Sequence, residues 1–251
     1  MPDPSIALTD DVFWIAEAFP LPDGRYEHVS VYLVRTDDGF IVIDSGSFHH
    51  RDSIRDRITR ATEGEGIRAM ILSHSDYPHS GNIEDFRQLW GDFEIIASCG
   101  DAAIQGLPYA TPSTMGGSLD VLGRTFRFID PPLADRSHTS WIYDTESRVM
   151  FAADGFGIYH GAGQTEWTSR DYEDGIPEDA IHDFHRDTIV WLRYVDPPVL
   201  SETLERMLEE HPTSWIAPIH GAPIAAEHQA DYMDKLERSV TAISEGYQVR
   251  V

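Results

Sequence analysis

The 251-residue chain has a single cysteine, Cys99, and a single lysine, Lys235. One cysteine excludes an intramolecular disulfide and a cluster of thiolate metal ligands. No window approaches the roughly 18 apolar residues of a membrane span, and the first residues lack the basic and apolar regions of a signal peptide. We therefore expect a soluble, cytoplasmic protein with no membrane partner. Cys99 follows the strand-like segment Phe93–Ala97, so we expect it to be a buried structural thiol.

Basic residues are also scarce, since 19 lysines and arginines face 43 carboxylates and the formal net charge is −24. Such a field repels phosphate backbones, which argues against nucleic acid as a partner. The charges also repel one another, and at about 1 M salt a Debye length of about 3 Å would largely screen that repulsion. The composition favours a halophilic source with a salt-rich cytoplasm. The alternative is an ordinary acidic protein from a high-GC genome.

Alternating or apolar segments, separated by turn residues, predict two groups of strands and an outer set of helices. The predicted strands are Val12–Ala18, Glu27–Arg35, Gly39–Asp44, Ile67–Leu72, Phe93–Ala97, Leu119–Leu122, Thr125–Ile129, Trp141–Tyr143 and Val149–Ala152. The predicted helices are Ser53–Thr62, Ile83–Trp90, Asp101–Gly106, Pro177–Tyr194, Leu200–Glu210 and Glu227–Glu245. This pattern fits an α+β fold, a four-layer αββα sandwich with two half-domains. Because no linker or repeat stands out, we expect residues 1–251 to form a single domain.

A histidine-rich stretch, S-H-S-D-Y-P-H-S-G-N, directly follows the apolar segment that ends at Leu72. It places His74, Asp76 and His79 in a loop at a strand end, together with Pro78. Three further candidate ligands stand beside predicted strands: His138 precedes one, and Asp154 and His220 each end one. Imidazoles and carboxylates without sulfur suit zinc, iron or manganese, and a carboxylate between imidazole clusters can bridge two ions. The sequence therefore predicts a metal site.

The stretch resembles the metal-binding signature of the metallo-β-lactamase superfamily, His-x-(His/Glu)-x-Asp-His-x-Gly. The carboxylate at Asp76, the H-S-G-N continuation and the D-G-F-G sequence from Asp154 make it most similar to the β-lactamase-like domain of flavodiiron proteins and their stand-alone diiron relatives. The turn at Asp44 also resembles the early Asp-x-Gly turn of the superfamily. The resemblance spans residues 10 to 245. Departures are Asp for Glu at 76, Pro for Asp at 78, and no attached flavodoxin-like domain in the sequence.

This resemblance implies two divalent metal ions, with iron favoured over zinc and no flavin bound by the chain. His74, Asp76 and His138 would hold one ion, Asp154 would bridge, and His79 and His220 would serve the second. Pro78 has no donor atom where the family has an Asp, so the second site would be weakened. Two imidazoles and a shared carboxylate can still hold iron(II) with open positions.

The implied function is binding, sensing or reduction of O2 or NO, with electrons from an external redox protein. Two alternatives remain open, a zinc-dependent hydrolase of an ester, thioester or amide, and a degenerate metal-binding or sensor domain without turnover. The resemblance also implies a homodimer. Among the other histidines, His160 is a candidate neighbour of the metals. His182 and His185 are interpreted as surface or supporting residues, because no carboxylate in family order lies near them.

Overall fold

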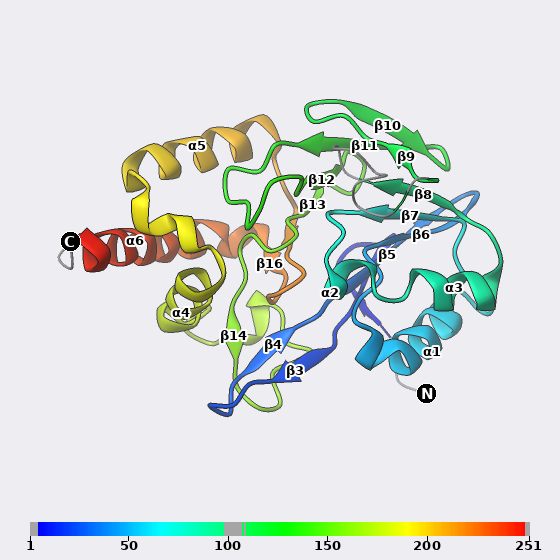
Figure 1. Cartoon of the computed structure of the whole chain (residues 1–251), viewed down its shortest axis with the longest axis horizontal. Coiled ribbons are helices and arrows are strands. Elements are labelled where there is room, and N and C mark those ends of the chain that lie inside the picture. The colour runs from blue at the N-terminus through cyan, green and yellow to red at the C-terminus, as the bar shows by residue number, and fades with distance from the viewer. Residues whose placement is uncertain (1–4, 98–106, 108, 249–251) are drawn as a thin grey trace. The chain divides into compact units, whose positions relative to one another are not determined.

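A computed structural model describes residues 5–97, 107 and 109–248 (Figure 1). The chain divides into two compact units, each formed by several segments of the sequence. Unit 1 comprises Met1–Glu17, Val29–Asp130 and His138–Ser147, and unit 2 comprises Ala18–His28, Pro131–Ser137 and Arg148–Val251. Cys99 and the predicted helix Asp101–Gly106 lie outside the described residues.

A seven-stranded sheet forms the frame of unit 1. Its strands, in spatial order, are β1 (Ile6–Ala7), β2 (Val12–Ile15), β5 (Val31–Thr36), β6 (Gly39–Ile43), β7 (Ala69–Leu72), β8 (Glu94–Ala97) and β9 (Thr111–Pro112). The strands from β1 to β6 pair antiparallel, whereas β6 to β9 run parallel. Parallel neighbours need a crossover connection. Because β6 and β7 are parallel, the residues that follow them, Asp44 and Ser73, emerge at the same edge of the sheet.

Two helices supply the crossovers and cover the same side of this sheet (Figure 1). They are α1 (Arg51–Ala61), between β6 and β7, and α3 (Ile83–Trp90), between β7 and β8. Ile54 and Ile58 of α1 recur at helical spacing. Together with Phe86 of α3 they are fully buried in one cluster with the strand residues Val42 and Met70. Burying a side chain such as Phe86 contributes about 1.5–3 kcal/mol to the stability of the fold.

Three further strands of unit 1 form an antiparallel group, β10 (Ser118–Val121), β11 (Arg124–Ile129) and β12 (Trp141–Asp144). The hairpin between β10 and β11 turns at Leu122 and Gly123, whose φ angles of 52° and 76° are typical of a two-residue turn that matches the strand twist.

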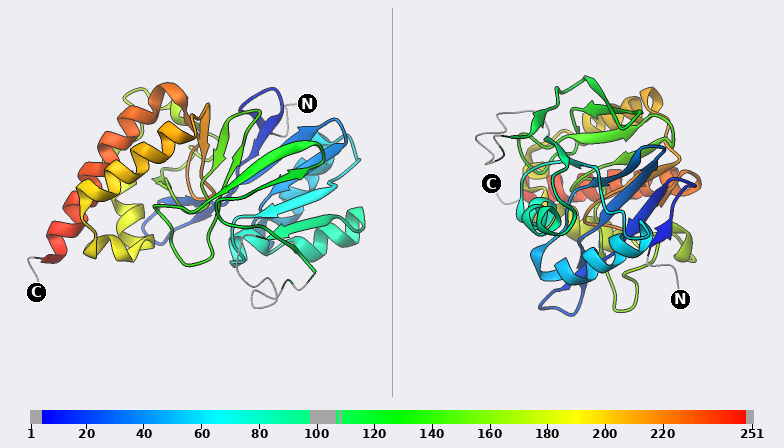
Figure 2. Two further views of the ribbon diagram at one scale, coloured as in Figure 1. Left: turned by 90° about the horizontal axis from the view of Figure 1, so that it is seen from above. Right: turned by 90° about the vertical axis from the view of Figure 1, so that its right-hand side faces the viewer.

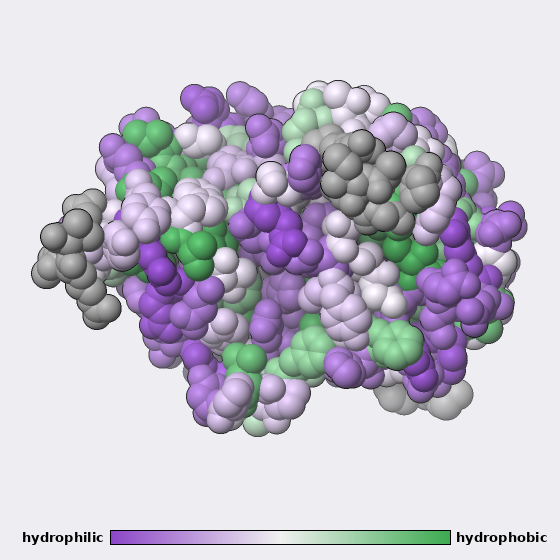
Figure 3. Space-filling model, viewed as in Figure 1, coloured by the Kyte–Doolittle hydropathy of each residue, from purple (hydrophilic) through white to green (hydrophobic). Residues whose placement is uncertain are grey.

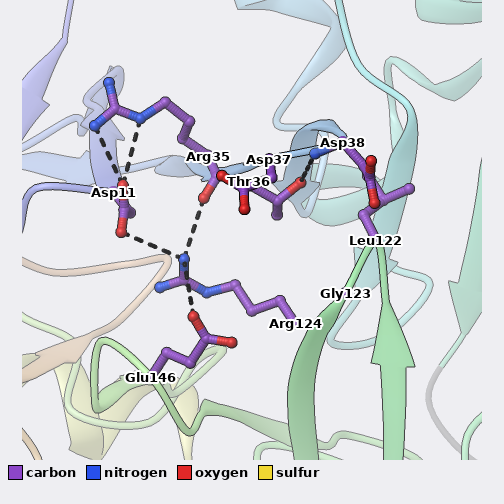
Figure 4. A pocket seen from close by; sticks show the side chains of 9 residues that line it. All are labelled: Asp11, Arg35, Thr36, Asp37, Asp38, Leu122, Gly123, Arg124 and Glu146. Atoms are coloured by element: carbon purple, nitrogen blue, oxygen red, sulfur yellow. Dashed lines mark hydrogen bonds and ion pairs between the residues drawn. The ribbon is translucent and has the colours of Figure 1, made fainter.

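A buried arginine joins the loops at one end of these strands. The guanidinium of Arg124 donates to both carboxylate oxygens of Asp144 and to the backbone oxygen of Arg35, which lies 3.1 Å from Nη1. Asp11 and Glu146 approach the same Nη1 at 3.6 and 3.9 Å, as Figure 4 shows. The surrounding pocket, about 270 Å³ in volume, is lined by four carboxylates and two guanidinium groups. Negative charge therefore exceeds positive charge there.

Unit 2 contains two small groups of strands and three long helices. The strands are β13 (Val149–Phe151), β15 (Trp215–Ala217) and β16 (Ile224–Ala225) in one group, and β3 (Ala18–Pro20), β4 (Tyr26–His28) and β14 (Tyr159–His160) in the other. The helices are α4 (Glu178–Thr188), α5 (Pro197–Glu210) and α6 (Gln229–Gln248). In the left view of Figure 2, α5 and α6 run side by side. Phe184 and Leu236 are among the buried residues of α4 and α6, which pack together.

Some of the predicted elements are interrupted. The segment Val12–Ala18, predicted as one strand, is divided between β2, which ends at Ile15, and β3, which begins at Ala18. The segment Glu27–Arg35, predicted as one strand, is divided between β4, which pairs with β3 and β14, and β5, which pairs with β2. The predicted helix Pro177–Tyr194 leaves the α conformation at Ile189 and continues as a 3₁₀ helix, Val190–Tyr194. The break falls in a run of β-branched residues, which lose side-chain freedom in a helix.

The face drawn in Figure 3 is largely hydrophilic, with small and separate hydrophobic patches. None of the helices in the described part of the chain combines the length and the apolar character that crossing a bilayer requires.

Candidate metal centre

In unit 1, the loop after β7 brings His74 and His79 together. All four residues of β7 are buried, so the strand holds the start of the loop in the interior. The loop then enters a short helix, α2 (Tyr77–Ser80). His74 and His79 are 2% and 0% exposed, and their ring centroids lie 3.8 Å apart. The sequence spacing thus produces a buried pair of imidazoles.

Asp44, which directly follows β6, contacts one member of this pair. It is fully buried and adopts a left-handed conformation with φ of 56°. Its carboxylate accepts hydrogen bonds from the backbone N–H and the hydroxyl of Ser73 at 2.8 and 2.7 Å. It also accepts from Nδ1 of His79 at 2.9 Å. The carboxylate therefore links the start of the loop after β7 to the His79 ring.

The Asp44 contact fixes the tautomer of His79. Because Nδ1 donates its hydrogen to the carboxylate, Nε2 carries the lone pair through which His79 would coordinate a metal. A carboxylate behind a metal-binding imidazole commonly orients the ring and raises its basicity. The arrangement therefore fits a metal ligand, although a buried ion pair without metal would also satisfy Asp44.

Hydrogen bonds join the turn after Asp44 to α2 and to the residue Asn82 that comes after it. Ser45 N donates to the backbone oxygen of His79 at 2.6 Å, and the Asn82 amide donates to the backbone oxygens of Ser45 and Ser47. Gly46 has φ of 74°, and a Cβ there would lie 2.5 Å from the Ile54 side chain. These contacts hold the two loops at the edge of the sheet in one geometry.

Three other residues of unit 1 that the sequence analysis considered are less buried. Asp76 is half-buried and directly precedes α2, and Pro78 is half-buried in the first turn of that helix. A proline is tolerated there because the first helical N–H groups have no partner within the helix. Sequence reasoning predicts an extended Tyr77 before Pro78, and this prediction is wrong, since Tyr77 begins α2. His138 is exposed and lies in unit 1 before β12.

In unit 2, Asp154 and His220 lie close together. Each follows a strand of the β13–β15 pair, and they are 8% and 5% exposed. Nε2 of His220 lies 3.7 Å from Oδ1 of Asp154. Nδ1 of His220 donates to the backbone oxygen of His28 at 2.8 Å and lies 3.1 Å from a Glu27 carboxylate oxygen. Since Nδ1 is engaged, Nε2 is the nitrogen through which His220 would coordinate, as for His79.

Four residues at these loops adopt left-handed backbone conformations without being glycine. They are Asp44, His138, Ala153 and Phe156, with φ of 56°, 74°, 47° and 60°. Such conformations are uncommon for residues with a Cβ and cluster at functional sites, where surrounding structure enforces them. Two of these four residues are candidate site residues, and the other two flank Asp154.

Further histidines of unit 2 have lowered pKa values. Burial, followed by repulsion from His160 and His220, lowers the pKa of His28 well below its usual value, and burial lowers that of His160. Sequence reasoning missed His28, whose position in an apolar segment gave no signal. It also interpreted His185 as a surface or supporting residue, and the surface alternative is wrong. His185 is fully buried, its Nδ1 donates to Ile181 O at 2.7 Å, and burial lowers its pKa to about 4.

Comparison with known proteins identifies relatives of this chain. Residues 28–221 match the family model described as "ODP family beta lactamase". A coenzyme F420H2 oxidase of Methanocaldococcus jannaschii is 24% identical over 236 residues, which cover 85% of this chain and 55% of that protein. A hydroxyacylglutathione hydrolase of Prochlorococcus marinus is 23% identical over 180 residues, covering 66% of this chain and 70% of the relative. The chain thus spans about half the length of the oxidase.

Among solved structures, the flavodiiron protein from Giardia intestinalis superposes with a TM-score of 0.71 at 14% identity. The match covers 96% of this chain and 59% of that protein. At this identity the likeness establishes the fold. Together with the family model, it confirms the expected α+β sandwich of metallo-β-lactamase type and the resemblance to flavodiiron domains.

Proposed function

Because the chain belongs to the ODP family of β-lactamase-like domains, we propose that it is a dinuclear, non-haem iron protein that binds, senses or reduces O2 or NO. We propose further that residues 1–251 act as one domain of this family. The observation that carries the proposal is the buried pair of His74 and His79, with His79 oriented by Asp44. The oxidase and the flavodiiron protein described above support the choice of iron and of redox chemistry.

The proposed ligand set follows family order. His74, Asp76 and His138 serve one ion, Asp154 bridges, and His79 and His220 serve the second. The second ion has fewer protein ligands because Pro78 offers no donor atom. Iron held by imidazoles and a carboxylate with open positions supplies binding and reduction of a diatomic ligand. The protein contributes the tautomers of His79 and His220, which Asp44 and the His28 carbonyl fix.

Electrons for turnover would come from outside residues 1–251, through an external redox protein. We also propose a homodimer, which sedimentation of the purified protein would test. Analysis of protein purified without oxygen tests the metal assignment, and we expect about two iron ions per chain with an oxo-bridge absorption after exposure to air. Zinc in place of iron would refute the assignment.

A substitution of His138 tests the ligand set. We choose His138→Asn because asparagine tolerates the left-handed backbone that His138 adopts, so the change removes the imidazole without adding strain. Most of the metal at the first site should be lost, and the melting temperature should fall, because metal binding is coupled to folding. The matched control is His49→Asn, at an exposed histidine of the same unit that lies in the 3₁₀ helix Phe48–His50. Unchanged metal content and melting temperature in His138→Asn would contradict the assignment.

A zinc-dependent hydrolase of a thioester, ester or amide is the second candidate, because a hydroxyacylglutathione hydrolase is among the relatives. Metal-bound hydroxide is the nucleophile in such enzymes, and an Asp of the motif helps to hold it. Pro78 stands at that position, which favours the redox proposal. Two zinc ions together with thioester hydrolysis would decide for the hydrolase.

A further inference from the structure

Unit 2 contains a pocket that includes none of the six proposed metal ligands. Its volume is about 220 Å³, and it lies beside β14, the loop that follows it and the start of α4. The lining includes Arg25, Tyr159, His160, Tyr172 and Asp183. Pockets for drug-sized molecules usually measure about 300–1,000 Å³, so this pocket suits a smaller compound.

Two buried side chains of this lining have polar atoms without a hydrogen bond. They are Nε2 of His160 and the hydroxyl of Tyr172, for which no partner exists among the described residues. His160 and Tyr172 are 4% and 9% exposed. A buried polar group without a partner is destabilising, so native proteins usually satisfy such groups with protein, water or ligand.

The hydrogen-bonding roles of these two atoms follow from their surroundings. Nδ1 of His160 donates to the backbone oxygen of Gly161 at 2.9 Å, so Nε2 carries a lone pair and accepts. Burial lowers the pKa of His160 and raises that of Tyr172 to about 12, which keeps both groups neutral near pH 7. A phenol can donate or accept. A fitting ligand therefore presents at least one donor and a second group of either kind.

Two of the three charged groups of the pocket, Arg25 and Asp183, are already in ion pairs, and the third, Asp179, is exposed to solvent and accepts from the Ala180 N–H. Arg25 donates to Asp23 at 2.8 Å and to Asp183 at 2.6 Å, and it covers the Tyr159 ring at 4.6 Å. The other oxygen of Asp183 accepts from Arg186 at 2.7 Å. An anion or a cation would have to displace one of these ion pairs, so the pocket favours a neutral ligand.

We propose that this pocket binds a small neutral polyol, whose hydroxyl groups hydrogen-bond to His160 Nε2 and the Tyr172 hydroxyl. Carbon-bound hydrogens of such a compound pack against the apolar wall formed by Tyr159, Tyr172 and Pro177. The polar groups of Gln164 and Asp179 at the same pocket offer further partners for hydroxyl groups.

Saturation-transfer NMR with erythritol and myo-inositol tests the proposal on the full chain. We expect dissociation constants in the millimolar range, about tenfold weaker binding in Tyr172→Phe, and no binding in Ala180→Leu, which fills the pocket. The control is Tyr232→Phe in the same unit, because the Tyr232 hydroxyl is buried outside the pocket and donates to Gly157 O. Its polyol affinity should equal that of the wild type.

Thermal unfolding without ligand gives a second readout. Tyr172→Phe should melt at the wild-type temperature or above, since it removes an unsatisfied hydroxyl, whereas Tyr232→Phe should melt lower. The proposal is overturned if neither polyol binds, if Tyr172→Phe and Ala180→Leu bind them as the wild type does, or if acetate or ethanolamine competes more strongly than the polyols.

Discussion

Replacement of Asp44 with asparagine should weaken metal binding through His79 while the fold around it persists. Asparagine tolerates the left-handed conformation of residue 44, and its size matches that of aspartate. Its amide oxygen can still accept the Ser73 N–H, but its NH2 group then faces Nδ1–H of His79. Two donors in contact repel, and His79 avoids this by moving its proton to Nε2. That nitrogen then has no lone pair for a metal.

The expected loss can be estimated from the role of the carboxylate. Removal of such a partner behind a metal-binding imidazole costs about 10- to 100-fold in affinity, which corresponds to about 1.4–2.7 kcal/mol. Calorimetric titration of the metal-free protein with iron(II) under anaerobic conditions measures it directly. The loss should appear at the second site, because Asp44 contacts His79.

Ser73→Ala provides the matched control. It removes the hydroxyl that donates to Asp44 at 2.7 Å and lies 3.1 Å from Nδ1 of His79, but it keeps the carboxylate next to His79. Its metal affinity should stay within about threefold of the wild type, the change expected from one modest hydrogen bond. Wild-type affinity at both sites in Asp44→Asn, with the variant folded by circular dichroism, would refute the tautomer reasoning.

Three further perturbations probe the motif, the buried histidines and the charge. Pro78→Asp should tighten second-site metal binding, because it places a carboxylate one residue before His79 in the first turn of α2, where aspartate is tolerated; Pro78→Ala is the control, and equal affinity in titrations of both variants would contradict the expectation. Because burial lowers the pKa of His185 from 6.5 to about 4, the unfolded chain takes up the proton first as the pH falls. The contribution of neutral His185 to the free energy of unfolding, about 3 kcal/mol, is therefore present above about pH 6.5 and lost towards pH 4. Urea unfolding at several pH values should show that His185→Leu reduces this pH dependence. His182→Leu, on the same helix, is the control. An unaltered pH dependence in His185→Leu, or an equal reduction in His182→Leu, would contradict the prediction. The melting temperature should rise between about 0.1 M and about 2 M sodium or potassium chloride, since both salts screen the net charge of −24. A melting temperature that does not change over this range would favour the compositional explanation of the acidity.

The sequence was most informative where a strand ends in a polar residue. Candidate ligands such as His74, Asp154 and His220 can be located without tertiary information, because each comes after an apolar segment and the residues after a buried strand lie at the edge of the sheet. The partners behind these residues were harder to find. The Asp44 turn was visible as a motif, but its hydrogen bond to His79 joins positions 35 residues apart and depends on the parallel pairing of β6 and β7.

Other features depended on packing that local patterns do not encode. The segment Glu27–Arg35 alternates at its start and then runs apolar without a turn residue, so its division between two sheets left no sign in composition. His185 is followed in sequence by two charged residues, Arg186 and Asp187, yet the helix face it occupies is covered in the fold. A periodicity gives the face of a helix, but it does not say which face receives a neighbour.

The left-handed residues near the candidate ligands bear on how this chain would diverge. Glycine would relieve the backbone strain at Asp44, His138, Ala153 and Phe156. Glycine would therefore be tolerated at these positions in a lineage that had stopped using the site. A side chain retained at Asp44 or His138 is explained by what that side chain does, whereas at Phe156, which is fully buried, packing is sufficient reason. Positions 44 and 138 thus separate descendants that still need the centre from those that keep only its scaffold.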